Sequence, residues 1–571
     1  MKKSYLFPLV LAGLMLGACS NDDWQEQGNN NVLPGEKGYI NLSVNLPTTT
    51  GSRALNGYED GTSDEYDVKN AKLLIFAGNS EADATCHSIY DLDISAFLGN
   101  TEAQITSTAE LVAAITRPDA GTIYALVVLN DNGLITEAMQ GRTFSSFYTT
   151  GNTLAASALN NNGFFMANAP LYSKAGGTGN PADGTVSTLS VIDPAKIYST
   201  RAEALSSPAA TVYVERALSK VTLTGNSTLS PDHNSHITAY VINGWTLDNT
   251  NRSTYLVRNV APTTAWWTYQ NGTAGYRFVD SSPVRSGVSL YRTHFGIDPN
   301  YTAAYDAANF QSVGKNPASL TPADGETPAY CLENTFDVAH MTEQHTTRAV
   351  IAAKLTVTGA EDTSGDFYLL NNNSNVIYQQ SAVLDEVKRL WMLHLDQIID
   401  TYVKSGTFTE GDVAVTLGNQ TNGGFVQVAA LVMSESGTIE YQDGQNLASL
   451  NAAAAAYIPT INNMLQIAYY KGGVAYYPVL IKHFGNEETP WDTSKIQNGN
   501  SYPGSDAENN WLGRYGVLRN TWYQLNVTSL KNIGSPEVPD VTTEYDDPGK
   551  QYISVEINIL PWAVRTQNVE L

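Results

Sequence analysis

Apolar and polar residues alternate most regularly in two stretches near opposite ends of the chain, Tyr39–Leu46 and Tyr552–Leu560. Alternation with a period of two predicts a β-strand that has one apolar face. Pro47 and Pro561 follow the two stretches, and proline ends a strand because it has no N–H to donate to a ladder. The apolar residues are Ile40, Leu42, Val44 and Leu46 in the first stretch, and Ile553, Val555, Ile557 and Ile559 in the second, after which Trp562 begins a looser apolar set.

Shorter apolar runs predict further strands, and three segments have helical patterns. A long helix is expected over 383–403, where an apolar residue recurs every three or four positions. A second helix is expected over 446–457, and a short one over 107–115, where Leu111, Val112 and Ile115 share a side. The class is therefore mainly β with a few helices. The expected strands are 71–77, 122–129, 211–214, 221–224, 237–246, 349–358, 476–481 and 523–530.

Composition supports this class and limits the partners. The chain has 571 residues, which favours two or more domains, and only 15% are charged. Its formal net charge is −24, so association with nucleic acid would begin with repulsion.

The N-terminus has the layout of a secretory signal. Lys2 and Lys3 precede an apolar run, which ends in Leu16-Gly17-Ala18-Cys19. This ending resembles a bacterial lipobox, in which Cys19 becomes the lipidated first residue. Residues 20–38 are polar and rich in Asn and Gly, typical of a tether. The polar stretch around Arg53 predicts an exposed loop, where proteases cut.

No residue pattern predicts catalysis, a metal or a cofactor. His340 and His345 are spaced five apart rather than four, and the acidic loop 361–366 lacks the spacing of an EF-hand. Cys86 and Cys331 are expected to be buried thiols rather than a disulfide. The chain has 32 Tyr residues. Exposed aromatic rings could bind sugars, but Tyr is also a common strand residue.

Several motifs together resemble the Bacteroidales fimbrillins, the subunits of type V pili, and within them the major-subunit kind of short fimbriae. They are the lipobox, Ala125–Asp131, Val214–Val221, Tyr469–His483, Val517–Pro536 and the terminal ISVEINILPWAVRTQNVEL. The resemblance implies two tandem transthyretin-like β-sandwich domains and no enzymatic activity. The expected divisions are a signal peptide 1–19, a tether and removable first strand 20–53, domains 54–213 and 214–550, and a C-terminal donor strand 551–571.

The resemblance also implies a sequence of export, proteolytic cleavage and assembly. The precursor would be anchored to the outer membrane through Cys19, and an Arg-specific protease would cut between Arg53 and Ala54. The donor strand of one subunit would then fill, in an identical or related subunit, the sites that the first strand's apolar residues vacate. The product would be a fimbrium at the cell surface. Two alternatives stay open: a surface lipoprotein that binds glycans for polysaccharide uptake, and a glycosidase that uses two carboxylates.

Overall fold

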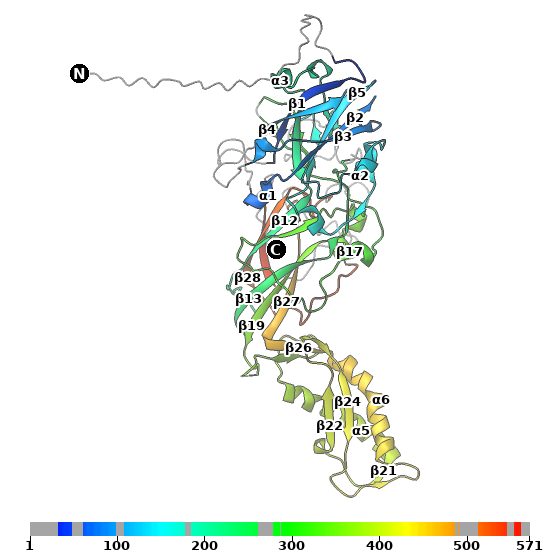
Figure 1. Cartoon of the computed structure of the whole chain (residues 1–571). Coiled ribbons are helices and arrows are strands. Elements are labelled where there is room, and N and C mark those ends of the chain that lie inside the picture. Colours follow the sequence, from blue (N-terminus) through cyan, green and yellow to red (C-terminus); the bar gives the residue numbers. More distant parts are fainter. Residues whose placement is uncertain are drawn as a thin grey trace, which may run out of the picture.

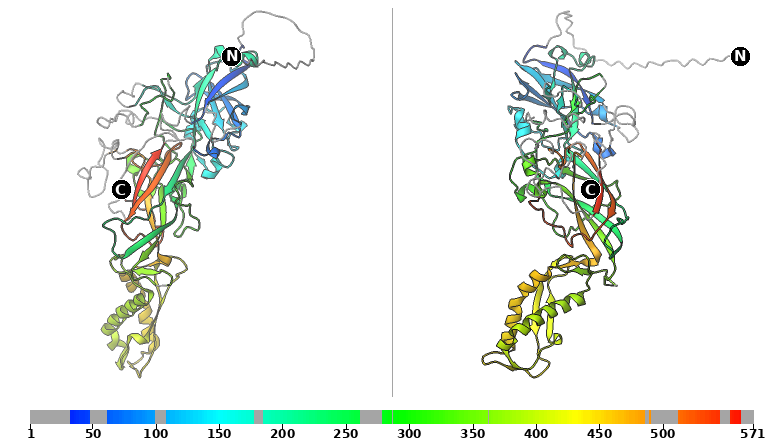
Figure 2. Two further views of the ribbon diagram at one scale, coloured as in Figure 1. Left: turned by 90° about the vertical axis from the view of Figure 1, so that its left-hand side faces the viewer. Right: turned by 180° about the vertical axis from the view of Figure 1, so that it is seen from behind.

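The computed structural model describes residues 32–47, 61–98, 108–176, 184–260, 278–285, 287–361, 363–485, 489 and 512–544, and the backbone alone of 553–560. Figures 1 and 2 show an elongated molecule in which two β-rich bodies and a smaller helical part follow one another. The predictions for Cys19, Arg53, Ala54 and Trp562 concern residues that lie outside the described ranges.

The first β-rich body is built on one large sheet that folds around an apolar core. Its strand order is β3-β2-β5-β7-β11-β1-β4, and β10 (Ser190–Val191) also pairs with β5. Short helices α1 (Ser63–Tyr66), α2 (Ser145–Thr149) and α3 (Arg201–Ala204) lie at its periphery. The strands are β1 (Lys37–Asn45), β2 (Ala71–Gly78), β3 (Thr85–Asp91), β4 (Thr108–Thr116), β5 (Thr122–Leu129), β7 (Met166–Asn168) and β11 (Ala210–Arg216).

The second β-rich body is a sandwich of two sheets. One has the order β18-β12-β28-β29 and the other β13-β19-β27. Side chains from both sheets, such as Leu525 and Ile351, are fully buried in one cluster, so the sheets pack face to face. The mainly β class with tandem sandwiches is confirmed. The strands are β12 (Leu218–Thr224), β13 (Ile237–Asp248), β18 (Ala329–Leu332), β19 (Arg348–Val357), β27 (Val474–Leu480), β28 (Trp522–Leu530) and β29 (Ile553–Leu560).

A helical subdomain is inserted between β20 (Phe367–Leu369) and β26 (Ile467–Tyr470). Its two helices are α5 (Gln380–Tyr402) and α6 (Leu447–Leu465), which confirms both longer helices predicted from the sequence. They share a core with the hairpin of β22 (Val413–Leu417) and β24 (Val428–Met433). Figure 1 shows this subdomain at the end of the molecule far from β1. Its shorter strands are β21 (Val403–Ser405), β23 (Gly424–Val426) and β25 (Glu440–Tyr441).

The described parts of 248–330 join the two sandwiches. β15 (Ser253–Thr254) pairs with β6 (Asn152–Thr153), and β16 (Tyr291–Arg292) pairs with β8 (Leu171–Tyr172), which also pairs with β9 (Val186–Ser187). β14 (Thr250–Asn251) pairs with β17 (Phe310–Gln311). β15 and β16 thus fix this loop-rich segment to the first sandwich, and the isolated bridges Trp245↔Thr321 and Thr224↔Asp324 fix it to β13 and to the end of β12 in the second.

A buried ionic cluster also holds the two sandwiches together. The Arg258 guanidinium lies 2.9 Å from a Glu215 carboxylate oxygen of β11, and it donates to the Arg519 carbonyl oxygen just before β28. Arg519 in turn lies 3.4 Å from the Glu333 carboxylate. Because removal of one partner would leave a buried charge unpaired, this cluster resists separation of the two bodies.

One predicted element is wrong. Residues 108–116 form strand β4, not a helix. Ala, Glu and Leu favour helices locally, but Ala109, Leu111, Ala113 and Ile115 alternate toward the core, and every residue of the segment pairs with β1. The long-range ladder therefore overrides the local preference.

The two sandwiches contain the same arrangement of neighbouring strands. In the order β7-β11-β1-β4 the successive pairs are antiparallel, parallel and antiparallel. The order β18-β12-β28-β29 repeats these three senses. β1 therefore has the position in the first sandwich that β28 has in the second, which is an internal position.

Candidate functional site

β1 occupies a groove between two strands that come later in the chain. It pairs antiparallel with β4 along its whole length, from Lys37↔Thr116 to Asn45↔Thr108. On its other side it pairs in parallel with β11, from Leu42↔Ala210 to Asn45↔Tyr213. β4 has β1 as its ladder partner and no other among the strands that the structure describes.

The apolar face of β1 is a structural part of the first core. Ile40, Leu42 and Val44 are completely buried, and Leu46 is 4% exposed. They belong to the same cluster as residues of β2, β4, β5 and β11. Each large apolar side chain buried in this way contributes about 1.5–3 kcal/mol.

The polar residues of β1 are also buried, which the alternating pattern alone did not indicate. Asn41, Ser43 and Asn45 are 2%, 6% and 5% exposed. Asn45 makes specific contacts with both walls of the groove: its Nδ2 donates to the Val212 carbonyl oxygen over 3.2 Å, and its Oδ1 accepts from the Thr108 hydroxyl over 2.8 Å. Asn41 Oδ1, by contrast, has no hydrogen-bond partner among the described residues.

The segment leading into β1 is packed tightly as well. A Cβ placed on Gly38 would lie 2.9 Å from Val32 Cγ2 and 2.8 Å from Ile197 Cγ2. The Arg117 guanidinium donates to the Val32 carbonyl oxygen. Gly38 therefore leaves room for Val32, which is buried in the first core.

The end of β1 reaches the junction with the second sandwich. The buried Arg216 guanidinium donates to the carbonyl oxygens of Pro47 (3.4 Å) and Glu65 (2.7 Å). Glu65 is fully buried and its carboxylate lies 2.8 Å from Lys220 Nζ. Lys220 Nζ lies 3.9 Å from the ring centroid of Trp522, at the start of β28. The Arg216 guanidinium thus contacts residues on both sides of the segment 48–60, which contains Arg53.

The C-terminal strand lies at an edge. β29 is the last strand in its sheet and pairs antiparallel with β28, from Trp522↔Leu560 to Leu530↔Ile553. Ile553, Val555, Ile557 and Ile559 all belong to this strand. Among the described strands β29 has one neighbour, whereas β1 has two. Figure 2 shows β29 as the outermost red strand beside β28.

In the part of the chain that the structure describes, the other candidate residues do not assemble a reactive site. His340 Nδ1 lies 2.6 Å from the Asp337 carboxylate, and the centroids of the His340 and His345 rings are 5.0 Å apart. Burial lowers the pKa of His345 to about 4. No group of three or more His, Cys, Asp or Glu side chains in the described residues could hold a metal ion. Cys86 and Cys331 are buried and unpaired, and burial raises the pKa of each thiol to about 12.

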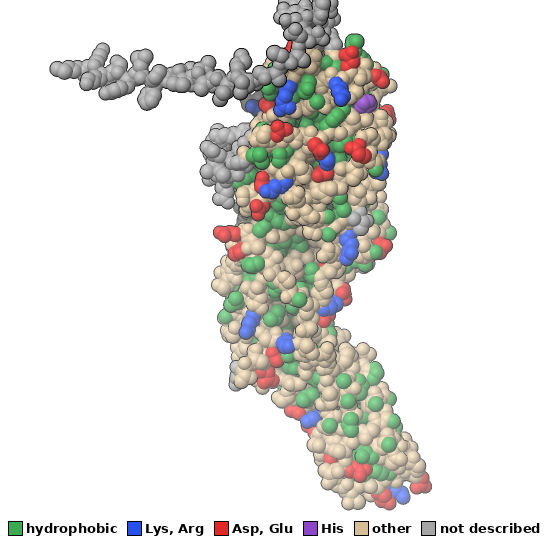
Figure 3. Space-filling model, in the orientation of Figure 1, with side chains coloured by type: hydrophobic (Ala, Val, Ile, Leu, Met, Phe, Trp, Pro, Cys, Tyr) green, Lys and Arg blue, Asp and Glu red, His purple; other side chains and the backbone are tan. Residues whose placement is uncertain are grey.

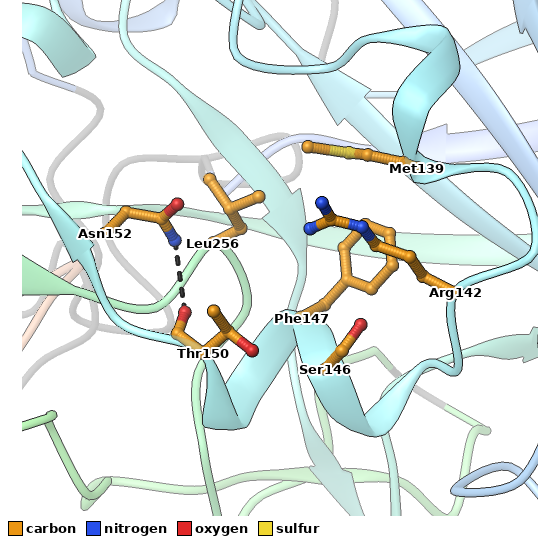
Figure 4. Close-up of a pocket in the computed structure, with 7 residues that line it drawn as sticks. All are labelled: Met139, Arg142, Ser146, Phe147, Thr150, Asn152 and Leu256. Atoms are coloured by element: carbon orange, nitrogen blue, oxygen red, sulfur yellow. Dashed lines mark hydrogen bonds between the residues drawn. The ribbon is translucent and has the colours of Figure 1, made fainter.

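A small pocket lies beside α2 (Figure 4). Its lining is Met139, Arg142, Ser146, Phe147, Thr150, Asn152 and Leu256. Arg142 is the one charged side chain among these lining residues, and no general base accompanies the Ser146 hydroxyl to activate it.

Within the described residues, no helix is long and apolar enough to cross a membrane. Acidic and basic side chains are interspersed on the face of the molecule that Figure 3 shows.

Comparison with known proteins identifies the C-terminal region. Residues 468–568, which include β27, β28 and β29, match the family described as major fimbrial subunit protein type IV, fimbrillin, C-terminal. This match covers the part of the chain that carries the edge strand and the internal strand beside it, and it supports a likeness of this region to the fimbrillins. No curated protein matches the chain in sequence.

Two solved structures are similar to this chain over most of its length. The fimbrilin FimA from Porphyromonas gingivalis W83 has 13% identity, with 92% of this chain and 99% of that chain covered, at a TM-score of 0.36. The tip fimbrial protein Mfa3 from Porphyromonas gingivalis, with a C-terminal truncation, has 12% identity, with 92% and 100% covered, at a TM-score of 0.31. The family match over residues 468–568 supports a fimbrial subunit at the cell surface that associates with related subunits.

Proposed function

We propose that this protein is a fimbrillin, a structural pilin that polymerises by donor-strand exchange. The precursor is exported as a lipoprotein anchored through Cys19 in the outer membrane, and an Arg-specific protease cuts it between Arg53 and Ala54. The segment that contains β1 then leaves with the anchor. The C-terminal strand of a neighbouring subunit takes its place, and the subunit has no enzymatic activity.

The observation that supports this proposal best is the two-sided pairing of β1. Its loss would remove the antiparallel ladder to β4 and the parallel ladder to β11 together. It would also expose the sites of Ile40, Leu42, Val44 and Leu46, and four such side chains contribute about 6–12 kcal/mol when buried. Unpaired strand edges beside apolar surface bind another strand readily.

The C-terminal strand is a suitable replacement. Ile553, Val555, Ile557 and Ile559 have the spacing of the four apolar residues of the first strand. β29 gives up one ladder, with β28, and would gain two in the groove. Each ladder hydrogen bond contributes about 0.5–1.5 kcal/mol net, so the exchange favours the groove. Because groove and donor are different surfaces, repeated contacts extend into a filament.

The glycan-binding alternative finds less support. In the described residues every Tyr and Trp side chain is buried or half-buried, and Phe425 is the exposed aromatic residue. An aromatic sugar platform needs several exposed rings on one face.

The proposal is tested by treating the purified precursor with an Arg-specific protease. The expected result is a new N-terminus at Ala54 and filaments in electron micrographs. Substitution R53Q should prevent both, while deletion of 552–571 should permit cleavage but prevent filaments. Filaments that form without residues 552–571 would contradict the assignment of the donor strand.

A further inference from the structure

The C-terminal strand is an internal copy of the first strand at the level of individual residues. When 37–47 is aligned with 550–560 in the same chain direction, four positions are identical and three more exchange one aliphatic residue for another. The identical pairs are Lys37 and Lys550, Tyr39 and Tyr552, Ile40 and Ile553, and Asn45 and Asn558. The aliphatic pairs are Leu42 and Val555, Val44 and Ile557, and Leu46 and Ile559.

The identity at Asn45 is informative, because this polar residue lies inside the sheet. Asn45 is 5% exposed, donates to the Val212 carbonyl oxygen of β11 and accepts from the Thr108 hydroxyl of β4. An amide can make both contacts, since it has a donor and an acceptor. A buried polar group that fits one position only fixes the register of a strand, because a slip leaves it without partners.

A difference between the two segments also has a structural reason. Gln551 aligns with Gly38, where a Cβ would meet Val32 Cγ2 at 2.9 Å. Val32 belongs to the segment that the proposed cleavage removes. Loss of Val32 would remove one of the two close contacts at this position, whereas Ile197 Cγ2, 2.8 Å from the added Cβ, would still have to shift.

We propose that Asn558 fixes the register and the direction of the donor strand by taking the site of Asn45 in the next subunit. The donor strand then runs antiparallel to β4 and parallel to β11, as β1 does. This inference rests on the proposed donor-strand exchange and adds to it the residue that selects one alignment among those that the apolar pattern permits.

Slips by two residues keep the apolar face inward, so the apolar residues alone do not exclude them. One slip would place Glu556 at the Asn45 site, where a carboxylate cannot donate to the Val212 carbonyl oxygen. The opposite slip would place Leu560 there and leave the Thr108 hydroxyl without its acceptor. In the proposed register Glu556 takes the place of Ser43, opposite Glu110 on the edge strand β4. Glu110 is exposed, whereas Ser43 is 6% exposed, so in this register Glu556 must extend past the edge strand beside Glu110 to reach water.

Cysteine pairs measure the register directly. In subunits with the groove substitution E110C, the donor carries S554C, E556C or N558C, and the mature filaments are oxidised. Directly opposed residues of an antiparallel pair have Cα atoms about 4.5–5.5 Å apart, which a disulfide can span. The native thiols of Cys86 and Cys331 are buried and do not compete.

The expected result is a disulfide-linked ladder with E556C and little with S554C or N558C. Linkage mainly through S554C or N558C would overturn the proposed register while leaving donor-strand exchange intact. Filaments that link through none of the three would contradict donor-strand exchange beside β4, and with it the proposed function.

The role of Asn558 itself is tested by N558L in the E110C–E556C background. The expected yield of linked subunits falls about fivefold or more, because the leucine leaves two buried polar partners unsatisfied. The matched control is S554A, which aligns with Asn41, a residue whose Oδ1 has no partner. Equal yields for N558L and S554A would overturn the role of Asn558.

Discussion

Substitution L42A should weaken the hold of the precursor on its own first strand. Leu42 is completely buried, opposite Leu111 on β4 and Ala210 on β11. Truncation of a buried leucine to alanine removes apolar contacts and leaves a cavity, at a cost of about 2–5 kcal/mol. With a urea m-value of about 2 kcal/mol/M, the unfolding midpoint of the first sandwich should fall by about 1–2.5 M. The same cost raises the population with β1 released about 30-fold or more.

Two assays follow from these magnitudes. Urea titration of the uncut precursor measures the fall in stability, and electron microscopy of uncut protein during long incubation measures escape of β1, which should let L42A form filaments slowly without protease. The matched control is L33A in the same removable segment, where the side chain is 59% exposed and the expected change is within about 0.5 kcal/mol. If L42A and L33A unfold at the same urea concentration, Leu42 does not lie in the first core and the groove is wrongly assigned.

Three further predictions concern the rest of the molecule. K220M should lower the unfolding free energy by about 3–5 kcal/mol in a urea titration, because it leaves the buried Glu65 carboxylate without its cationic partner. K69M, which removes an exposed ion pair, should cost less than about 1 kcal/mol. Equal effects of the two substitutions would contradict the junction as described. Burial raises the pKa of Asp298 to about 7, so the folded state favours the protonated carboxyl, and this group's stabilisation is complete below about pH 4 and is lost as the pH rises to about 7. D298N should therefore flatten the dependence of the melting temperature on pH between 4 and 7, and an unchanged slope would be contrary to a buried Asp298. With a formal net charge of −24, cleaved subunits should polymerise faster in light scattering at 0.15 M than at 0.01 M salt, since screening weakens repulsion; slower assembly at the higher salt would indicate attraction between charged surfaces instead.

The sequence predicted the strands whose pattern is local. Tyr39–Leu46 and 553–559 alternate strictly, and both are strands; the apolar stripe of α5 also predicted its helix correctly. β4 was predicted wrongly because its helix-forming residues pair with a strand far away in sequence. The groove wall was therefore missed even though the strand that fills it was predicted.

The candidate site, too, was predictable only where its residues form a local pattern. Apolar periodicity identified Ile40, Leu42, Val44 and Leu46 as one face. It could not identify Asn45 as a bridge between Thr108 and Val212, or Arg216 as a contact of both Pro47 and Glu65, because these contacts depend on which distant segments meet. The helical subdomain likewise was predicted as two helices, but nothing local indicated that they form a separate core.

The central claim is that a neighbouring subunit's C-terminal strand replaces β1 between β4 and β11. A cryo-EM map of filaments grown from protease-treated precursor tests it most directly. The account predicts continuous density in that groove which traces to 553–560 of the adjacent subunit, with residues 37–45 absent. Density for the subunit's own β1 in the groove, or 553–560 still paired with its own β28 throughout the filament, would contradict the account.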